Sequence, residues 1–527
     1  MKKIIIYTFL ALFLVSIVGC EEWLDVNQNP NDLTISTPEL VFTGAAKLYG
    51  ERQFMGSGFS LFGVWMGYFG HCGGWSGWHE VHSYQMTSSQ YTGFWNPYTN
   101  ILKSTKYVKD HSMKEGNWGL VGASKVIEAG TYERIIDTYG DVPCFSATGG
   151  MEGVTNPVYD DAQEIYEDLV VQLDSAVWYL NEAIDGHVDI DAGADPLFGG
   201  NKTKWIQYAN VLKMRLLLKQ ADMSGRDSYI SANWSFDDAG FPTEVTMNPG
   251  YISGSSGKMN PLYESYYKNY KDDWTSGHTQ YGMNVFLQHL YQEGNDPRMM
   301  MCFIQGKYSD DWSHGLQLGI NGAPEDHYGG VAGEACLIGA GIAGKNDDDS
   351  QVMSEPEIKF MMAEAVARGY TIPGVTATAE ELWEEGIEAS FYYYGNRADW
   401  NSGDISDTLA YYMNEIELHS ELGWDAGNPI KSIIYQKYLA GLGLYHYQAW
   451  TDYRRTGYPD PYDKNAVDYS MISYYYITVK DQVPVRMLYV QDELDLNPVN
   501  VNSAIDKTGY PYNDQFIMDA RIFWDVN

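Results

Sequence analysis

The sequence is short of positive charge. Its 34 Lys and Arg side chains face 70 Asp and Glu, which gives the 527-residue chain a formal net charge of −36. Such a charge repels nucleic-acid phosphates and anionic lipid headgroups, so neither is an expected partner. The composition is still that of a large folded protein, with 44% hydrophobic and only 20% charged residues, and its 43 tyrosines suit wet binding surfaces.

Long apolar runs are missing everywhere except at the N-terminus. There, a short basic start is followed by an apolar run at 4–18, which is too short to span a bilayer comfortably and is typical of a secretion signal. The tetrapeptide that ends at Cys20 resembles a lipobox, the site at which bacteria acylate a cysteine after cleavage. We therefore expect residues 1–19 to be a lipoprotein signal peptide, Cys20 to carry the lipid, and residues 20–527 to form a single domain.

Cysteines are few, and the motifs of common enzyme families are absent. Beyond the lipobox the cysteines are Cys72, Cys144, Cys302 and Cys336. Because none of them forms a CxxC pair, neither a redox motif nor a zinc knuckle is expected; their spacing does not reveal a disulfide pattern, and we expect mostly buried thiols. No GxSxG or P-loop motif occurs. The sequence therefore predicts a protein that is not an enzyme and that needs no cofactor.

Two short motifs resemble functional sites but are incomplete. Residues 339–344 match GxGxxG, yet the acidic run that follows would repel a pyrophosphate, so we interpret the segment as a flexible loop. His79 begins a sequence one residue short of the zinc-protease motif HExxH. We interpret it as part of a polar loop beside a ligand. The alternative is a metal site shared by neighbouring side chains, namely His71, Cys72, His79 and His82.

Apolar residues recur at helical spacing along much of the chain. Asp160 with Gln163, and Ser354 with Glu357, are spaced as capping boxes that begin helices, the second of which stops at Gly369. Similar patterns predict helices over about 120–139, 203–222, 379–395 and 430–450. Long connections rich in Gly, Asn and Tyr lie at 232–282, 305–350 and 456–515. We expect a mostly α-helical scaffold of helix pairs with functional loops, the main insertions being about 232–282 and 305–350.

A series of longer segments occurs in a fixed order. It comprises LDVNQNPN at 24–31, YGDVP at 139–143, WIQYANVLKMR at 205–215, DPRM at 296–299, AEA at 363–365, EGI at 385–387, QKY at 436–438, AW at 449–450, YRRTGYP at 453–459 and PVRMLY at 484–489. In this order and spacing, and with the lipobox, the chain resembles the SusD/RagB family of outer-membrane nutrient-binding lipoproteins over roughly residues 20–527. Val490 and Tyr208 depart from the residues usual in the family, and we interpret both as tolerated changes in the scaffold.

The resemblance implies a mostly α-helical fold whose core is four tetratricopeptide-like helix pairs. It implies a non-catalytic lipoprotein, anchored in the outer membrane and exposed at the cell surface. Such proteins capture extracellular glycans, or peptides in some relatives, beside a SusC-like TonB-dependent transporter. The motifs themselves are implied to be scaffold. The segment 453–457 is accordingly interpreted as a packing and hydrogen-bonding corner, with an anion site as the alternative.

Two loop regions combine aromatic and polar side chains as sugar-binding sites do. Sugars present apolar C–H faces ringed by hydroxyls, which flat aromatic rings and Asn, Asp, Gln and Arg side chains recognise. The mixture occurs at 71–84 and again across 262–281 and 305–314. From these loops we predict the ligand contacts Trp75, Trp78, His79, Asp272, Trp274, Tyr281, Tyr308 and Trp312.

The net charge favours a neutral glycan over an acidic one. Two other functions stay open at this point. The same scaffold would bind peptides through backbone hydrogen bonds, and a surface glycosidase would place two loop carboxylates in a cleft. No pattern in the sequence names the sugar or its linkage, and none predicts a metal.

Overall fold

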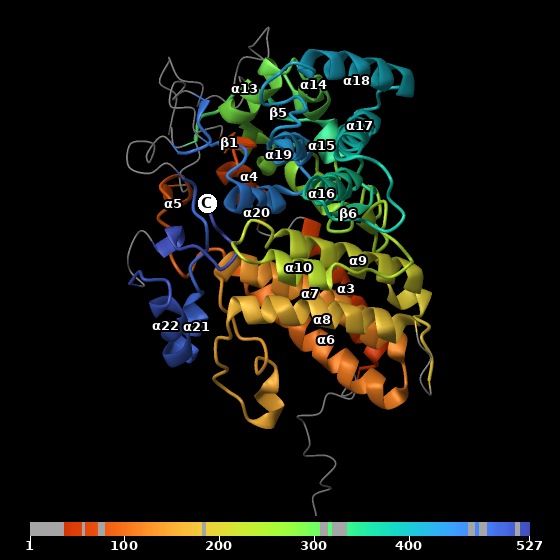
Figure 1. The fold of residues 1–527 in the computed structure, drawn as a ribbon, viewed down its shortest axis with the longest axis vertical. Coiled ribbons are helices and arrows are strands. Elements are labelled where there is room, and N and C mark those ends of the chain that lie inside the picture. Colours follow the sequence, from red (N-terminus) through yellow and green to blue (C-terminus); the bar gives the residue numbers. More distant parts are fainter. Residues whose placement is uncertain are drawn as a thin grey trace, which may run out of the picture.

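The computed structural model of the protein describes residues 36–54, 58–71, 79–181, 186–305, 315–318, 335–461, 469–473, 482–511 and 517–527. Helices dominate these segments, and the strands are short (Figure 1). The prediction of a mostly α-helical chain is confirmed. Within the described segments, no helix has both the length and the apolar character that crossing a membrane requires.

Long helices from the N-terminal half form a stack in the lower part of Figure 1. They are α3 (Pro38–Phe54), α6 (Asn96–Glu115), α7 (Trp118–Tyr139), α8 (Ala162–Asn181) and α9 (Lys202–Leu218). α3 packs on α6, α6 on α7, α7 on α8 and α8 on α9. The turn from α6 to α7 is tight because Gly116 adopts a φ of 72° and the Asn117 side chain caps α7 by accepting a hydrogen bond from the Leu120 N–H at 3.2 Å. α7 lies at the centre and is buried almost all round.

A second stack lies in the upper part of Figure 1. Its members are α4 (Gly58–Trp65), α16 (Glu355–Ala367), α17 (Ala379–Arg397), α18 (Ser402–Ile416), α19 (Pro429–Ala440) and α20 (His446–Thr456). α16 packs on α17 and α19, α17 on α18, and α20 on α4. Contacts between α9 and α16 join the two stacks.

Shorter helices fill the connections. They are α5 (His79–His82), α10 (Asp227–Asn233), α11 (Pro261–Tyr266), α12 (Ser276–Gln280), α13 (Val285–Glu293), α14 (Arg298–Cys302), α15 (Ala340–Ala343), α21 (Gln491–Leu496) and α22 (Pro498–Asp506), with 3₁₀ turns at Thr92–Phe94, Gly149–Glu152, Ala192–Ala194 and Ile517–Asp519. The long connections expected at 232–282 and 305–350 therefore carry several short elements.

The strands form two small antiparallel sheets. One has the order β1 (Phe69–His71), β3 (Tyr281–Met283), β5 (Leu337–Ile338) and β4 (Phe303–Ile304). The other pairs β2 (Val245–Met247) with β6 (Ser350–Met353). The first sheet lies beside α4 in the upper stack.

Most of the predicted helices are present, and one is split. Helices over 120–139, 203–222 and 379–395 match α7, α9 and α17. The predicted helix over 430–450 is instead two helices, because Gly443 takes a φ of 72° and donates its N–H to His446 Nε2 at 2.8 Å. α19 ends at Ala440, and the turn at Gly443 then leads the chain into α20.

Both predicted capping boxes begin helices, but their side chains act differently. Asp161, not Asp160, caps α8 by accepting hydrogen bonds from the N–H groups of residues 163 and 164 at 2.9 and 3.2 Å. The Asp160 carboxylate instead accepts from the N–H of Cys144 at 2.8 Å. Ser354 caps α16, while the Glu357 carboxylate turns inward to a buried arginine. At Glu357, an ion pair with a buried arginine therefore replaces the hydrogen bond that a capping box would make at the start of the helix.

The GxGxxG segment is packed, so its interpretation as a flexible loop is wrong. It forms the short helix α15 against α14 and α17. A β-carbon at Gly341 would lie 2.5 Å from the Met301 carbonyl oxygen, and one at Gly339 would lie 2.8 Å from that of Cys302. These glycines permit a close approach of two backbone segments and make no phosphate cradle.

Buried ion pairs hold the upper stack together. Glu364 on α16, only 1% exposed, receives both guanidinium nitrogens of Arg455 on α20, at 2.5 and 2.6 Å, and the Nε of Arg368 at 2.8 Å. Burial by itself would raise the pKa of Glu364, but the two guanidinium groups outweigh it and hold the pKa at about 2.

We expect Glu364→Gln to lower the free energy of unfolding by about 3–5 kcal/mol at pH 7, because it removes the buried carboxylate that Arg455 and Arg368 share and leaves Arg455 with Asp452 as its nearest buried carboxylate. Since the folded pKa of about 2 lies below the unfolded value of 4.5, the carboxylate stabilises the fold above pH 4.5 and loses this effect as the pH falls toward 2. Urea unfolding of the protein without residues 1–20 should therefore show a smaller gap between wild type and variant at pH 3 than at pH 7. The control Glu51→Gln breaks the exposed Lys47–Glu51 pair and should cost less than about 1 kcal/mol. Equal losses in the two variants would contradict this account.

Candidate ligand-binding site

The four-stranded sheet brings distant parts of the chain to one edge. Strand pairing places His71 opposite Tyr281, and Leu337 opposite Ile304. Leu337 also pairs with Gly282, the residue next to Tyr281. All four residues therefore lie at the same edge of the sheet, where β1 and β4 end and β3 and β5 begin. Every loop that the sequence predicts to bind ligand starts or ends beside this edge.

The turn between α11 and α12 presents side chains next to the sheet edge. The Asn269 side-chain oxygen accepts hydrogen bonds from the N–H groups of Lys271 at 2.8 Å and Asp273 at 3.1 Å. Asp272 at the tip has a φ of 68°, a left-handed conformation that Asp and Asn tolerate. The turn therefore has a defined shape and leaves the Asp272 side chain 76% exposed.

Trp274 follows this turn and is an exposed aromatic residue of the site, as is Tyr270 within the turn, at 45%. Half of Trp274 is accessible to solvent, at 50%. Its ring stacks on His278, with centroids 4.2 Å apart and an interplanar angle of 19°, and Tyr267 packs against it edge-on at 5.0 Å. The Lys268 ammonium lies 5.0 Å from the Trp274 ring centroid and 2.9 Å from Asp272. A ring held in this way loses little entropy when a ligand covers it.

His278 supports Trp274 from inside the protein. It is 3% exposed, and its Nε2–H donates a hydrogen bond to the Ile338 carbonyl of β5 at 3.0 Å. The Nδ1 atom has no hydrogen-bond partner within the described segments. Burial lowers the pKa of His278 below its ordinary value, so the ring is neutral at pH 7 and the site carries no imidazolium charge.

Tyr281 lies under the site in strand β3. It is 4% exposed, and its ring contacts Tyr266 at 5.5 Å and His71 at 5.0 Å between centroids. Burial raises the pKa of Tyr281, and burial together with the neighbouring His82 lowers the pKa of His71 to about 3, so both groups are uncharged at neutral pH. A direct ligand contact by Tyr281 stays a prediction; the structure shows it as part of the support.

Among the predicted ligand contacts, the structure brings Asp272 and Trp274 together at the sheet edge. His79 is the first residue of α5, and its role is untested. The remaining predicted contacts, Trp75, Trp78, Tyr308 and Trp312, lie outside the described residues, as does Cys20.

Sequence reasoning missed the residues that hold Trp274, namely Tyr267, Lys268 and His278. The signal for His278 was its position four residues after Trp274, with Thr275 between them as a helix cap. The Thr275 hydroxyl oxygen accepts a hydrogen bond from the His278 N–H at 3.2 Å and begins α12, which places the two rings on one face.

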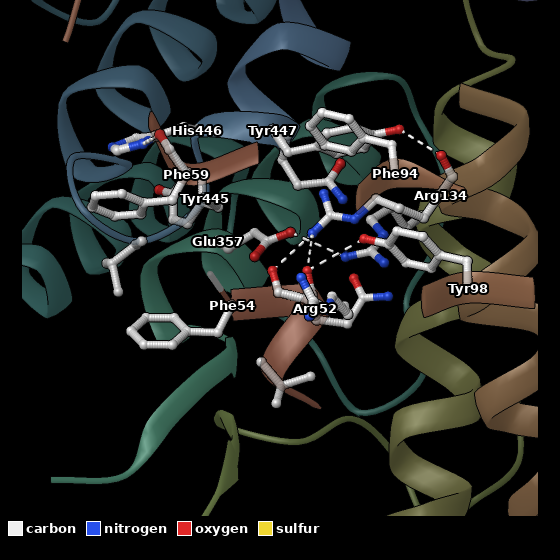
Figure 2. A pocket seen from close by; sticks show the side chains of 15 residues that line it. Arg52, Phe54, Phe59, Phe94, Tyr98, Arg134, Glu357, Tyr445, His446 and Tyr447 are labelled. Atoms are coloured by element: carbon white, nitrogen blue, oxygen red, sulfur yellow. Dashed lines mark hydrogen bonds and ion pairs between the residues drawn. The ribbon is translucent and has the colours of Figure 1, made fainter. Parts of the chain in front are cut away.

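A buried pocket elsewhere in the molecule is too small to bind a ligand. Figure 2 shows Arg52, Arg134 and Glu357 around it, with the rings of Tyr98 and Tyr445 nearby. Its volume is about 20 Å³, which is room for about one water molecule. It belongs to the interior of the scaffold.

The described residues contain no group of three or more His, Cys, Asp or Glu side chains placed to hold a metal. The rings of His71 and His82 lie 5.3 Å apart between centroids. Cys72 and the side chain of His79, which the alternative metal site also needs, lie outside the described residues.

The sequence matches a known protein family over most of its length. The family model described as "SusD-like_2: Starch-binding associating with outer membrane" matches residues 61–489. The chain belongs to the SusD-like family. No curated protein sequence matches it.

Solved structures agree with this assignment. A SusD/RagB family protein from Bacteroides thetaiotaomicron has a TM-score of 0.71 at 19% identity, covering 93% of this chain and 99% of that one. A chitin-binding SusD homologue from Flavobacterium johnsoniae has a TM-score of 0.69 at 20% identity, covering 92% and 99%. At these identities the matches show that the chain has the SusD-like fold, and the resemblance inferred from the sequence is confirmed.

The arginine corner of this SusD-like protein is scaffold, as interpreted from its sequence. Arg454 donates to the carbonyl oxygens of Asp137 and Val485, both at 2.8 Å. Its guanidinium lies 3.5 Å from the Trp450 ring centroid and 4.4 Å from that of Trp524. The side chain is 1% exposed, so it joins α7, α20 and the C-terminal segments and does not meet an anion from solvent.

We expect the His278 imidazole to titrate below its ordinary pKa of 6.5, because the charged ring would be buried. The unfolded chain then binds the proton more tightly, so the stability that neutral His278 contributes decreases as the pH falls through 6.5. NMR titration of protein labelled with ¹³C-histidine, with the resonance assigned by loss in His278→Gln, measures the midpoint. A midpoint at or above 6.5 would show that the ring is solvated and that the buried support described here is wrong.

Proposed function

We propose that this SusD-like protein captures a neutral glycan outside the cell and hands it to a SusC-like TonB-dependent transporter, without catalysing a reaction. The observation that carries the proposal is the half-exposed Trp274 ring, fixed on the buried and neutral His278 beside the sheet edge. A sugar ring stacks its C–H face on such a surface, while neighbouring carboxylates and amides accept its hydroxyls.

The charges around Trp274 favour a neutral ligand. Asp272 and Asp273 are exposed in the turn, and the nearest cation, Lys268, is already paired with Asp272. With Lys268 and Lys271 matched by Asp272 and Asp273, the turn offers no net positive charge to an acidic polysaccharide, which would also meet the net charge of −36. The sequence prediction that Trp75, Trp78, Tyr308 and Trp312 complete the aromatic surface is part of this proposal.

Family membership supports the setting of the proposed function. The family is described as starch-binding and associated with the outer membrane, and one structural relative is described as chitin-binding. The lipobox ending at Cys20 supports a lipid anchor at the cell surface. Delivery to a transporter and the absence of catalysis come with the family resemblance and belong to the proposal.

We expect Trp274→Ala to weaken glycan binding at least about tenfold, or about 1.4 kcal/mol, because it removes the stacking surface. Affinity electrophoresis in gels containing soluble starch, glycol chitin or an acidic polysaccharide, followed by titration calorimetry, measures the change. Trp178→Ala is the matched control, since Trp178 is similarly exposed, at 42%, but lies on α8 in the lower stack.

Retention of the wild type by a neutral glycan, lost in Trp274→Ala and kept in Trp178→Ala, is the expected result. No retention by any glycan, with heat released on adding mixed peptides, would replace the proposal by peptide capture on the same scaffold.

Cys20→Ser should abolish attachment to the membrane, because the thiol is the proposed site of acylation. Labelling of cells with an alkyne fatty acid should mark the wild type and leave the variant unmarked, and the variant should leave the membrane fraction. Cys144→Ser is the control, and its labelling should equal that of the wild type. Equal labelling of the Cys20→Ser variant would place the anchor elsewhere.

A further inference from the structure

A groove of about 580 Å³ lies at the upper end of the molecule, apart from Trp274. It is bounded by the end of α13, by α14, by the turn before α18 and by α18 itself, elements that lie near one another at the top of Figure 1. Its volume is within the range of small-molecule sites in proteins. Neither the family description nor the sequence analysis assigns a role to it.

The lining of this groove has the mixture that sugars require. Trp400 is partly exposed and Tyr411 is 49% exposed, so both offer ring surface. Polar side chains around the rings can exchange hydrogen bonds with hydroxyl groups: Gln292, Asn295, Asp407 and Thr408. Among the described residues, no lysine or arginine lines the groove, so an acidic ligand finds no charge partner there.

The backbone around the groove is already hydrogen-bonded, which argues against a peptide ligand. The N–H of Asn295 donates to the Gln292 carbonyl at 3.1 Å, that of Asp296 to Tyr291 at 2.8 Å, and that of Trp400 to Gly395 at 2.9 Å. An extended peptide binds chiefly through free backbone groups of its receptor, as in strand addition. Because these three N–H groups are occupied, the side chains are the main donors on offer, which suits hydroxyl-rich ligands.

The groove is built on a rigid support. Arg298 at the start of α14 is fully buried and bonds to Asp296 at 2.6 Å and to the Tyr412 hydroxyl at 3.1 Å. These contacts tie α14 to α18, whose residues form the opposite wall. The walls are therefore set before a ligand arrives, and binding does not need to order them.

We propose that this groove is a second site for the neutral glycan, with Trp400 and Tyr411 as its stacking surfaces. The inference rests on the proposed function, since it takes the ligand to be the same polymer. α14 continues directly into β4, so one short segment joins exposed Met300, which lines the groove, to exposed Ile304 at the sheet edge. From helix rise and strand spacing, the groove and the start of β3 are within about 20 Å, a distance that one oligosaccharide chain can span.

Hydroxyl-radical footprinting of the full mature chain tests the site directly. Soluble starch and glycol chitin are the probes, and the one that retains the wild type is used at saturation. We expect it to slow oxidation of Trp400 and Met300 at least threefold while leaving Trp178 unchanged. The same protection should appear in Trp274→Ala at higher glycan concentration, because the groove does not contain Trp274.

Two variants test its contribution to affinity. Trp400→Ala/Tyr411→Ala should weaken retention by the polysaccharide about tenfold. Because Trp400 also packs against the core, the surface variant Asp407→Ala/Tyr411→Ala serves as a second test, with the thermal midpoint of each measured beside that of Trp178→Ala.

The outcomes separate the two proposals. If the wild type is retained but Trp400 and Met300 stay unprotected, or if both groove variants are retained like the wild type, the second site is wrong and the function stands. If no glycan retains the wild type, the proposed function fails first and the groove assignment fails with it.

Discussion

Charges buried between the two helix stacks set how the rest of the chain is arranged. Arg215 on α9 donates two hydrogen bonds to the Glu133 carboxylate of α7, at 2.7 and 2.6 Å, and one to Glu357 of α16 at 3.3 Å. Lys219 donates to Glu133 at 2.8 Å. None of these side chains is more than 5% exposed. A buried charge is tolerated only when its partners are all in place. The network therefore fixes how α7, α9 and α16 meet, and with them the two stacks.

A second buried cluster, around Arg298, fixes the elements next to the binding surface. Arg298 bonds to Asp296, to Ser390 of α17 at 2.8 Å and to Gln436 of α19 at 3.0 Å. It thereby fixes α14 on the upper stack, and α14 runs without interruption into β4 at the sheet edge. Arg215 and Arg298 are themselves buried and support the binding surface from inside, although Asp296, Pro297 and Met299 beside Arg298 line the proposed second site. Their contacts hold the helices in place. The loops attached to these helices can therefore vary in sequence without disturbing the scaffold.

The sequence predicts the scaffold well and the site in part, for physical reasons. An amphipathic period reveals α8, a cap at Ser354 reveals α16, and the ordered motifs reveal the family. Helix α3 is not predicted because its buried face includes Gly50 and Gln53 while the apolar Leu40 is exposed, and α6 begins at Asn96 without a side-chain cap from Trp95. Strands of two to four residues are too short to show an alternating pattern. The exposed role of Trp274 follows from its loop composition, but the stacking of His278 on it depends on a hydrogen bond to β5, a strand that is distant in sequence.

The proposed capture and release of a glycan place opposite demands on one surface, and weak contacts at several points reconcile them. A single deep pocket that bound a polymer tightly would release it slowly, since affinity is set mostly by the dissociation rate. Shallow aromatic surfaces joined by one polymer chain give high overall affinity while each contact stays weak, because every further contact is intramolecular. Release can then proceed one contact at a time as a partner takes up the polymer end. The shallow Trp274 surface at the sheet edge, together with the groove beside α14, which we infer to be a second contact, is the arrangement that this reasoning favours.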